Sequence, residues 1–414
     1  MNCIIASLSR LTVRGKPKLL QCNPKRTIFM RALSQSVVTA NTEMKTCKSK
    51  NDFPHKMKMR GWHIHSYGDL DELTYSDNIR IPQIKHATEV LIRIKAVSVN
   101  PIDVAIIGGY GATLLNVMRM TDIEFPLIVG RDFVGEIIYR GIGVPKNLKL
   151  GDTVWGVIAP HSSGCHCEYV VQDSSLITNK PHSLSNIEAS GILYCGLTAW
   201  SGLFLSGNLG NKCRTLRQQQ YPNEKRVLIL GASGGVGTMA VQIAKNEKAT
   251  VFATAASDAT EMLSHLGADC VIDYKNENFL KEIHSNGPYD IILDCAGYGP
   301  KFVSKIECDF GSYVTFSSPL LRNIDTYGFV SGNIQNAMSL IEDNSLTISK
   351  KGRGFVKWGY FVAMQRGIEY LKKMADQGKL KCVIDSVYGF DNAMEAYQKV
   401  KDGHLRGKII MDLS

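Results

Sequence analysis

The stretch Arg226-Val-Leu-Ile-Leu-Gly-Ala-Ser-Gly-Gly-Val-Gly237 decides the fold of this 414-residue chain, because it joins an apolar run to a glycine-rich turn. The run is typical of a parallel strand buried on both faces. Residues 238–245 follow with apolar side chains at helical spacing. A glycine-rich turn between such a strand and helix directs backbone N–H groups at an anionic phosphate, although the Gly-x-x-Gly-x-x-Gly spacing also fits a structural loop. The residues expected at the phosphate are Ser233, Gly234, Gly235 and Val236.

Strand-like and helix-like segments alternate after this turn. The apolar runs predict strands at 249–255, 270–273, 289–294 and 311–316, with a helix at about 258–266. Strands and helices that alternate at this spacing indicate a doubly wound parallel sheet. The predicted fold class is therefore α/β.

The end of the second predicted strand bears on the choice of cofactor. NAD-binding proteins place an acid there to accept hydrogen bonds from ribose hydroxyls. Here the strand ends in the small hydroxyl residue Ser257, which favours NADP(H), with Ser257 as a donor to the 2′-phosphate. Tyr274 is a second donor at the next strand end. Asp258 follows Ser257, and its alternative role is to cap the next helix.

The basic excess of the chain is concentrated at its N-terminus. Lys and Arg number 48 against 38 Asp and Glu, and residues 1–42 contain seven basic residues and no acid, leaving about +3 of the net charge of +10 for the rest. This distribution does not indicate a nucleic-acid-binding surface. The N-terminal composition is typical of a mitochondrial presequence, with a disordered basic tail as the alternative. We expect a linker at 43–56 and folded structure from near Met57.

Composition excludes two further classes of protein. No run of about 18 apolar residues occurs, so no membrane-spanning helix is expected. The eleven cysteines lack paired spacing, which predicts reduced thiols and not a disulfide scaffold. One segment contains four potential metal ligands at close spacing, namely His161, Cys165, His166 and Cys167. We interpret this segment as a turn that binds no metal.

Further motifs occur in the order seen in medium-chain dehydrogenase/reductases. They are Ser98-Val-Asn-Pro-Ile-Asp103, Gly109-Tyr-Gly-Ala-Thr113, Gly130-Arg-Asp-Phe-Val-Gly135, Gly151-Asp-Thr-Val-Trp-Gly156, Gly196-Leu-Thr-Ala-Trp200 and Gly267-Ala-Asp-Cys-Val-Ile-Asp-Tyr-Lys275. With the glycine turn, they resemble the zinc-free quinone oxidoreductase branch of that superfamily over nearly everything from Met57 to Leu413. The resemblance implies a GroES-like β-rich domain at 57–188, completed by 380–414, and a Rossmann domain at 189–379.

The zinc ligands of related alcohol dehydrogenases are missing. Those enzymes carry Gly-His-Glu where this chain has Gly130-Arg131-Asp132, and their first ligand Cys is replaced within Asn-Pro-Ile-Asp. We therefore expect no metal. Hydride transfer then depends on positioning and on donors that polarise the acceptor oxygen. The resemblance puts Asn100 and Tyr110 near the substrate, with Tyr110 as a proton donor. The structural alternatives are a turn at Asn100 and a flexible lid at Tyr110.

Other cofactor contacts follow from the resemblance alone. It implies that Thr198 approaches the nicotinamide and that Phe361 lines it, with core packing as the alternative for Phe361. The remaining implied contacts are Cys295, His404, Leu405 and Arg406. Arg406 is a candidate phosphate contact. Lys408, two residues later, belongs to the same loop, with an ordinary solvated charge as its alternative.

The resemblance implies an NADPH-dependent enzyme of the mitochondrial matrix that transfers hydride to a quinone or a related conjugated carbonyl. It links the chain to ubiquinone biosynthesis and respiratory-chain maintenance, with a reticulon among its protein partners and a homodimer as its assembly. Two alternatives stay open. A 2-enoyl thioester reductase would need a long acyl channel and a basic patch for its carrier, and a cofactor-bound scaffold protein would lack turnover. Residues 208–225 are interpreted as a surface insertion.

Overall fold

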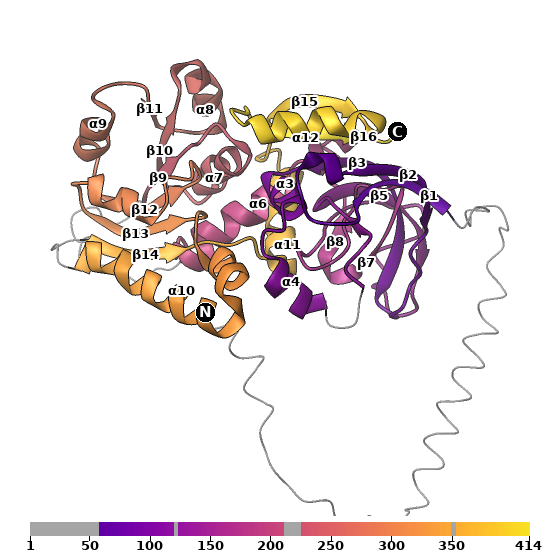
Figure 1. Cartoon of the computed structure of the whole chain (residues 1–414). Coiled ribbons are helices and arrows are strands. Elements are labelled where there is room, and N and C mark those ends of the chain that lie inside the picture. The colour runs from indigo at the N-terminus through magenta and orange to yellow at the C-terminus, as the bar shows by residue number, and fades with distance from the viewer. Residues whose placement is uncertain (1–57, 120–122, 211–224, 349–352) are drawn as a thin grey trace, which may run out of the picture. The chain divides into compact units, whose positions relative to one another are not determined.

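The computed structural model of the chain describes residues 58–119, 123–210, 225–348 and 353–414 (Figure 1). The expected presequence at 1–42, the expected linker at 43–56 and most of the expected insertion at 208–225 lie outside these residues. The first described strand begins at Lys58, close to the expected start of folded structure.

A six-stranded parallel sheet contains the strand that leads into the glycine turn. Its strand order is β11-β10-β9-β12-β13-β14, and each neighbouring pair runs parallel. The strands are β9 (Arg226–Leu230), β10 (Thr250–Ala255), β11 (Cys270–Asp273), β12 (Tyr289–Asp294), β13 (Phe310–Thr315) and β14 (Arg353–Trp358). β11 and β12 match their predicted ranges, while β10 and β13 differ by one residue at their ends. The predicted α/β fold is confirmed.

Helices connect the strands of this sheet (Figure 1). They are α7 (Gly235–Asn246), α8 (Thr260–Leu266), α9 (Phe279–Ser285) and α10 (Leu320–Ile348), with α6 (Leu193–Trp200) before the sheet and α11 (Gln365–Asp376) after it. A 3-10 turn, η5 (Ser257–Ala259), precedes α8, so the helix predicted from 258 begins at Thr260. α10 is bent at Gly328, where φ is +77°. Positive φ is a region that favours glycine.

A second, mostly antiparallel sheet contains the last strand of the chain. Its seven strands are β3 (Glu89–Val99), β5 (Asp132–Arg140), β6 (Thr153–Val157), β7 (Tyr169–Asp173), β8 (Ile177–Asn179), β15 (Ile384–Gly389) and β16 (Lys408–Asp412). β16 pairs antiparallel with β3, with Ile410 opposite Ser98. The C-terminal strand therefore lies beside residues that precede the Asn-Pro-Ile-Asp motif.

Smaller elements complete the described chain. β1 (Lys58–Ile64), β2 (Thr74–Arg80) and β4 (Leu127–Ile128) form a three-stranded sheet, and α5 (Asn186–Ser190) and α12 (Ala393–Asp402) are further helices. α3 (Pro101–Ile107) and α4 (Ala112–Arg119) meet at a bend of 89°. In the described residues no single helix is long and apolar enough to cross a membrane, although this bent pair passes the test of length and composition together.

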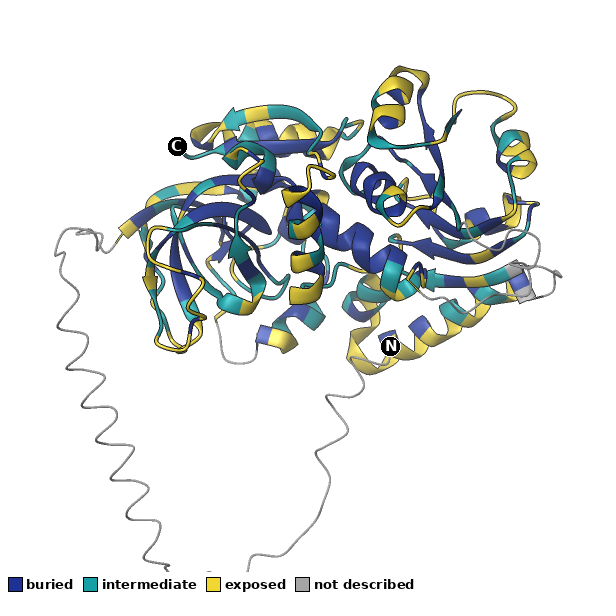
Figure 2. Cartoon of the chain, turned by 180° about the vertical axis from the view of Figure 1, so that it is seen from behind, coloured by how far each residue is buried: buried dark blue, intermediate teal, exposed yellow. Residues whose placement is uncertain are grey.

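One apolar core joins the two larger sheets. Trp155 of β6, Leu197 of α6 and Ile229 of β9 belong to the same buried cluster, and all three are fully buried. The central strands of both sheets are mostly dark blue in Figure 2, whereas the edge strands β11 and β15 are mostly teal and exposed residues follow the outer helices. α6 therefore packs between the sheet that carries the glycine turn and the sheet that carries Asn100.

Candidate active site

The glycine turn leaves the N-terminus of α7 without a side-chain cap. Gly234 is the N-cap residue of this 12-residue helix, and no side chain bonds to its first amides. A Cβ atom on Gly234 would meet only the Gly231 carbonyl oxygen, at an ordinary contact distance of 3.8 Å. A Cβ atom on Gly237 would lie 2.4 Å from that same oxygen, so Gly237 lets the helix approach the strand. Uncapped amides at a helix start fit an anionic phosphate group.

Polar groups from the chain's end gather beside this turn. The Gly407 N–H donates to the Ser233 carbonyl at 3.0 Å, which holds the C-terminal loop against the turn. Arg406 Nη1 lies 3.4 Å from Ser233 Oγ, and its Nη2 donates to both carboxylate oxygens of Asp258 at 2.9 and 3.0 Å. The predicted residues Ser233 and Arg406 are thus brought together, and Asp258 joins them.

The other predicted phosphate-side residues have different surroundings. Ser257 is exposed two residues after the end of β10, and the Tyr274 N–H donates to the carbonyl of Ala255, the last residue of that strand, at 3.1 Å. His404 is exposed with a φ of +54°. Leu405 packs against the apolar core of the antiparallel sheet. Ser257 and Tyr274 are therefore neighbours along one sheet edge, while Leu405 is used for packing.

Residues at the start of α7 also pack inward. The Cys295 N–H donates to the Leu230 carbonyl at 2.9 Å, which places Cys295 beside the first residue of the turn. A Cβ atom on Gly235 would lie 2.9 Å from Cys195 Sγ. Val236 packs against the core shared by the two sheets. Gly235 is therefore favoured by close packing within the protein.

A second group of predicted residues forms around α6. Phe361 stacks on Tyr194 with ring centroids 4.5 Å apart, and the Thr198 hydroxyl donates to the Tyr194 carbonyl at 2.8 Å. Burial raises the pKa of Tyr360 to about 12, and the phenol of Tyr110 contributes to that rise as a neighbour. Phe361 and Thr198 therefore both contact Tyr194, and the electrostatic influence of Tyr110 reaches Tyr360, the residue before Phe361.

Tyr110 lies in a loop that α10 holds in place. The N–H groups of Gly111 and Thr113 donate to the two carboxylate oxygens of Asp325 at 2.7 and 3.0 Å. Asp325 thereby caps the start of α4 from a different part of the chain. Burial raises the pKa of Tyr110, and the nearby Arg322 opposes that rise. The phenol therefore carries its proton at neutral pH.

Asn100 is fully buried, and its amide is already used inside the protein. Its Nδ2 donates to Ser98 Oγ at 3.1 Å and to Asp132 Oδ1 at 3.0 Å. Its Oδ1 accepts from Lys408 Nζ. In this arrangement neither amide hydrogen is left for a substrate, so a substrate contact at Asn100 would require these bonds to rearrange.

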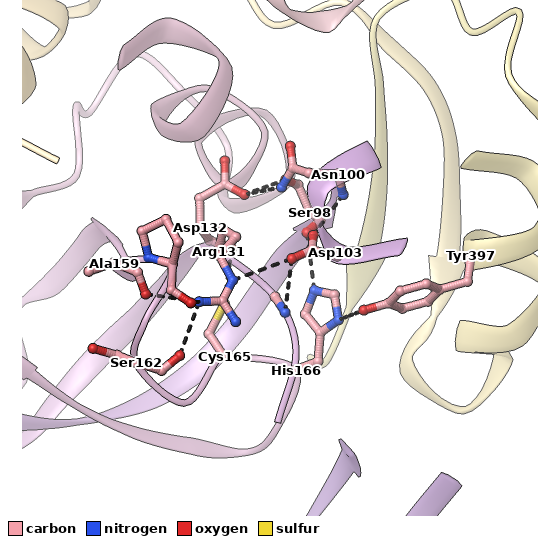
Figure 3. Close-up of polar contacts among 12 residues, drawn as sticks. Ser98, Asn100, Asp103, Arg131, Asp132, Ala159, Ser162, Cys165, His166 and Tyr397 are labelled. Atoms are coloured by element: carbon pink, nitrogen blue, oxygen red, sulfur yellow. Dashed lines mark hydrogen bonds and ion pairs between the residues drawn. The ribbon is translucent and has the colours of Figure 1, made fainter. Parts of the chain in front are cut away.

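Asn100 belongs to a larger group of buried, charged residues (Figure 3). We call Asn100, Asp103, Arg131, Asp132 and Lys408 the buried polar cluster. Arg131 Nε lies 3.5 Å from Asp103 Oδ1, and both side chains are 0% exposed. Burial raises the pKa values of Asp103 and Asp132, and Arg131 and Lys408 respectively oppose that rise. Two cations thus balance two acids inside the core, which buried charges require.

The alternative of a solvated charge at Lys408 is excluded by its burial. Its side chain is 3% exposed and donates to Asn100 Oδ1. Burial lowers the pKa of Lys408, but Cys195 and Asp132 outweigh burial and raise it overall. We attribute the rise to the Asp132 carboxylate, because burial also raises the pKa of the Cys195 thiol and keeps it neutral. Nothing in Gly-Lys-Ile-Ile alone distinguishes this lysine from a surface one.

His166 has no nitrogen left for a metal. Its Nε2 lies 3.1 Å from the Ser98 carbonyl and its Nδ1 2.7 Å from the Tyr397 hydroxyl. A carbonyl only accepts, so Nε2 carries the hydrogen and Nδ1 accepts from Tyr397. Burial lowers the pKa of His166 to about 4. Across the described ranges, no group of three or more His, Cys, Asp or Glu residues is arranged to hold a metal ion, nor does a disulfide join any two cysteines.

Comparisons with known proteins agree with this architecture. Residues 86–204 match the alcohol dehydrogenase GroES-like domain, and residues 266–411 match a family described as zinc-binding dehydrogenase. The solved quinone oxidoreductase of Coxiella burnetii is similar with a TM-score of 0.66 and 26% identity, covering 86% of this chain and 100% of that one.

Curated relatives are similar over most of their length. NAD(P)H oxidoreductase RTN4IP1, mitochondrial, of Drosophila melanogaster is 48% identical over 86% of both chains. Reticulon-4-interacting protein 1, mitochondrial, of Caenorhabditis elegans is 32% identical over 85% of this chain and 94% of its own. With the parallel sheet, the uncapped turn and the shared core, these matches assign the chain to an enzyme family that binds a nicotinamide cofactor. The chain belongs to the mitochondrial NAD(P)H oxidoreductases of the medium-chain dehydrogenase/reductase superfamily.

Proposed function

We propose that the chain is an NADPH-dependent reductase that transfers hydride to a quinone or a related conjugated carbonyl without zinc. The clamped Tyr110 loop carries this proposal. Asp325 bonds to two backbone amides next to Tyr110, and the phenol neighbours Tyr360, whose segment includes the stacked Phe361. A protonated phenol at the nicotinamide region supplies the proton that the acceptor oxygen needs.

The residues of the buried polar cluster support zinc independence. The guanidinium of Arg131 donates through Nη1 to the carbonyls of Ala159 and Ser162 at 2.9 and 3.0 Å. It also pairs with Asp103. A fixed cation in the Gly-Arg-Asp segment disfavours a divalent ion beside it. Polarisation of the acceptor is therefore assigned to hydrogen-bond donors.

The chemistry divides between the cofactor and the chain. Reduced nicotinamide, when bound, supplies a hydride to the conjugated system of the acceptor. The phenol of Tyr110 donates its proton to the acceptor oxygen, and solvent returns a proton to the phenolate. Phe361 and Thr198 limit where the nicotinamide ring can lie, so positioning supplies much of the rate.

The proposed preference for NADPH over NADH rests on the residues expected to contact the 2′-phosphate. The exposed Ser257 follows β10, and Arg406 lies beside Ser233 at the glycine turn. A hydroxyl and a guanidinium are donors that suit a phosphate group.

Cofactor consumption by the purified chain tests the proposal. NADPH oxidation is followed with quinones, enals and enoyl thioesters, and Tyr110→Phe is expected to lower kcat with quinones about 100-fold or more. Tyr327→Phe is the control, because Tyr327 is 57% exposed on α10. Oxidation with enoyl thioesters alone would assign the alternative reductase. NADPH binding without consumption of any acceptor would assign the scaffold protein.

We also propose a cellular setting for this activity. The names of the relatives support action in mitochondria and contact with a reticulon. We propose that the chain acts in the matrix and assembles as a homodimer. We also propose that its activity serves ubiquinone biosynthesis and respiratory-chain maintenance. Deletion of residues 1–42 is expected to abolish import while NADPH consumption by the purified chain is retained. Unchanged import after this deletion contradicts the targeting role of the segment.

A further inference from the structure

An acidic side chain is paired with the arginine beside the glycine turn. Arg406 Nη2 donates to both carboxylate oxygens of Asp258 at 2.9 and 3.0 Å, and Arg406 Nη1 lies 3.4 Å from Ser233 Oγ. The Arg406 backbone N–H donates to Asp385 Oδ2 at 2.9 Å, which fixes the base of the side chain. The guanidinium is therefore held next to the turn by a carboxylate of the protein itself.

Asp258 stands where a 2′-phosphate is expected. It directly follows Ser257 at the end of β10, within η5. It does not serve as the cap of α8, whose N-cap residue is Ala259 without a side-chain bond. The sequence left two roles open for Asp258, capping of α8 and cofactor selection. The structure shows no capping, and the carboxylate pairs with Arg406 instead.

The Asp258–Arg406 pair is accessible to a ligand. The two side chains are 68% and 35% exposed. An exposed ion pair is weakly held, because water screens the charges and both side chains lose rotamer freedom. A phosphate dianion offers a guanidinium more charge and more acceptor atoms than a carboxylate does. Such a ligand can exchange with Asp258 for Arg406.

Resting on the proposed NADPH function, we infer that Asp258 is a specificity-determining residue that competes internally with the 2′-phosphate for Arg406. It keeps Arg406 beside Ser233 while no phosphate is bound, and its charge opposes the phosphate when the cofactor enters. Asp258 therefore lowers the affinity for ligands that carry a 2′-phosphate. Ligands without this phosphate leave the pair intact and do not sense it.

Binding of two adenosine fragments by the full chain tests this inference. The probes are 2′,5′-ADP, which carries the 2′-phosphate, and 5′-AMP, which lacks it. Asp258→Asn is expected to tighten 2′,5′-ADP about tenfold, since one negative charge is removed near the phosphate and Arg406 is released. The affinity for 5′-AMP is expected to change by less than about twofold. Calorimetry gives both dissociation constants.

Two further variants make the result specific. Asp376→Asn removes the same charge from an exposed ion pair with Lys372 on α11, and is expected to leave both affinities unchanged. In an Arg406→Ala background, Asp258→Asn is expected to tighten 2′,5′-ADP by less than about threefold, because only the repulsion is then relieved.

The possible failures are distinguishable. If the unaltered chain binds 2′,5′-ADP no more tightly than 5′-AMP, the proposed preference for NADPH fails. If it prefers 2′,5′-ADP but Asp258→Asn leaves that affinity unchanged or weakens it, only the competition fails. Weakening would show that Asp258 positions Arg406 for the phosphate.

Discussion

Two Arg–Asp pairs in this protein have the same chemistry and opposite surroundings. Arg131 and Asp103 are both 0% exposed and belong to the buried polar cluster. Arg406 and Asp258 are 35% and 68% exposed beside the glycine turn. A buried charge that loses its partner has no water to replace it, whereas an exposed one does. The first pair is therefore tied to folding, and the second is available for exchange with a ligand.

The two regions also differ in whether their side chains keep a hydrogen-bond donor free for a substrate. In the buried polar cluster, the side-chain amide of Asn100 donates both of its hydrogens, to Ser98 and to Asp132. Tyr110, by contrast, lies in a loop that Asp325 of α10 holds in place, and its side chain is only partly buried. A donor that faces a substrate must keep a hydrogen free. Tyr110 is therefore the proposed proton donor, and the proposed role of the cluster is to position the chain around it.

The largest effect is expected from breaking the buried pair. Arg131→Met leaves the Asp103 carboxylate without its cation, and is expected to lower the free energy of unfolding by about 3–5 kcal/mol. Urea denaturation measures the change. The double variant Asp103→Asn with Arg131→Met is expected to regain part of the loss, because no lone charge remains.

An exposed pair provides the control for this experiment. Arg93 pairs with Glu136 at 3.1 Å, and their side chains are 52% and 25% exposed. Arg93→Met is expected to cost less than about 1 kcal/mol. A similar cost at Arg93 and Arg131 would remove the distinction between buried and exposed pairs.

The next largest effect concerns pH and His166. Its pKa falls from 6.5 to about 4 on folding, because burial disfavours the cation. The unfolded chain therefore binds more protons than the folded chain between these values, so stability falls as pH decreases through this window. The contribution of His166 is complete above pH 6.5 and is expected to fall by about 3 kcal/mol by pH 4.

Substitution isolates this contribution from those of other titrating groups. Unfolding free energies of the unaltered chain and of His166→Gln are measured between pH 7 and pH 4. The difference between them is expected to shrink as pH decreases. His284→Gln, which removes an exposed imidazole, is measured in parallel as the control. A constant difference for His166→Gln would mean that folding does not shift the pKa of this ring.

The sequence predicted what is local and missed what is distant. The parallel strands and the glycine turn are encoded by neighbouring residues, and β11 and β12 match their predicted ranges. Lys408 bonds to Asn100 across 308 residues, and Asp325 reaches the Gly111 amide across 214 residues. No periodicity reports such contacts, because burial of one lysine depends on which distant amide it meets.

The smallest effect separates ligand binding from packing within the glycine turn itself. A Cβ atom at Gly234 would meet only the Gly231 oxygen at 3.8 Å, whereas one at Gly237 would lie 2.4 Å from it. Gly234→Ala is therefore expected to leave the unfolding free energy nearly unchanged while weakening NADPH binding roughly tenfold, because the added methyl group would stand where we propose that the pyrophosphate binds. Gly237→Ala is expected to destabilise the fold instead, because backbone atoms must move. Fluorescence titration with NADPH and urea denaturation of both variants measure the two quantities. Suppose instead that Gly234→Ala and Gly237→Ala weaken NADPH binding equally and neither lowers the free energy of unfolding. Both glycines would then contact the ligand, and Gly237 would not be needed for packing.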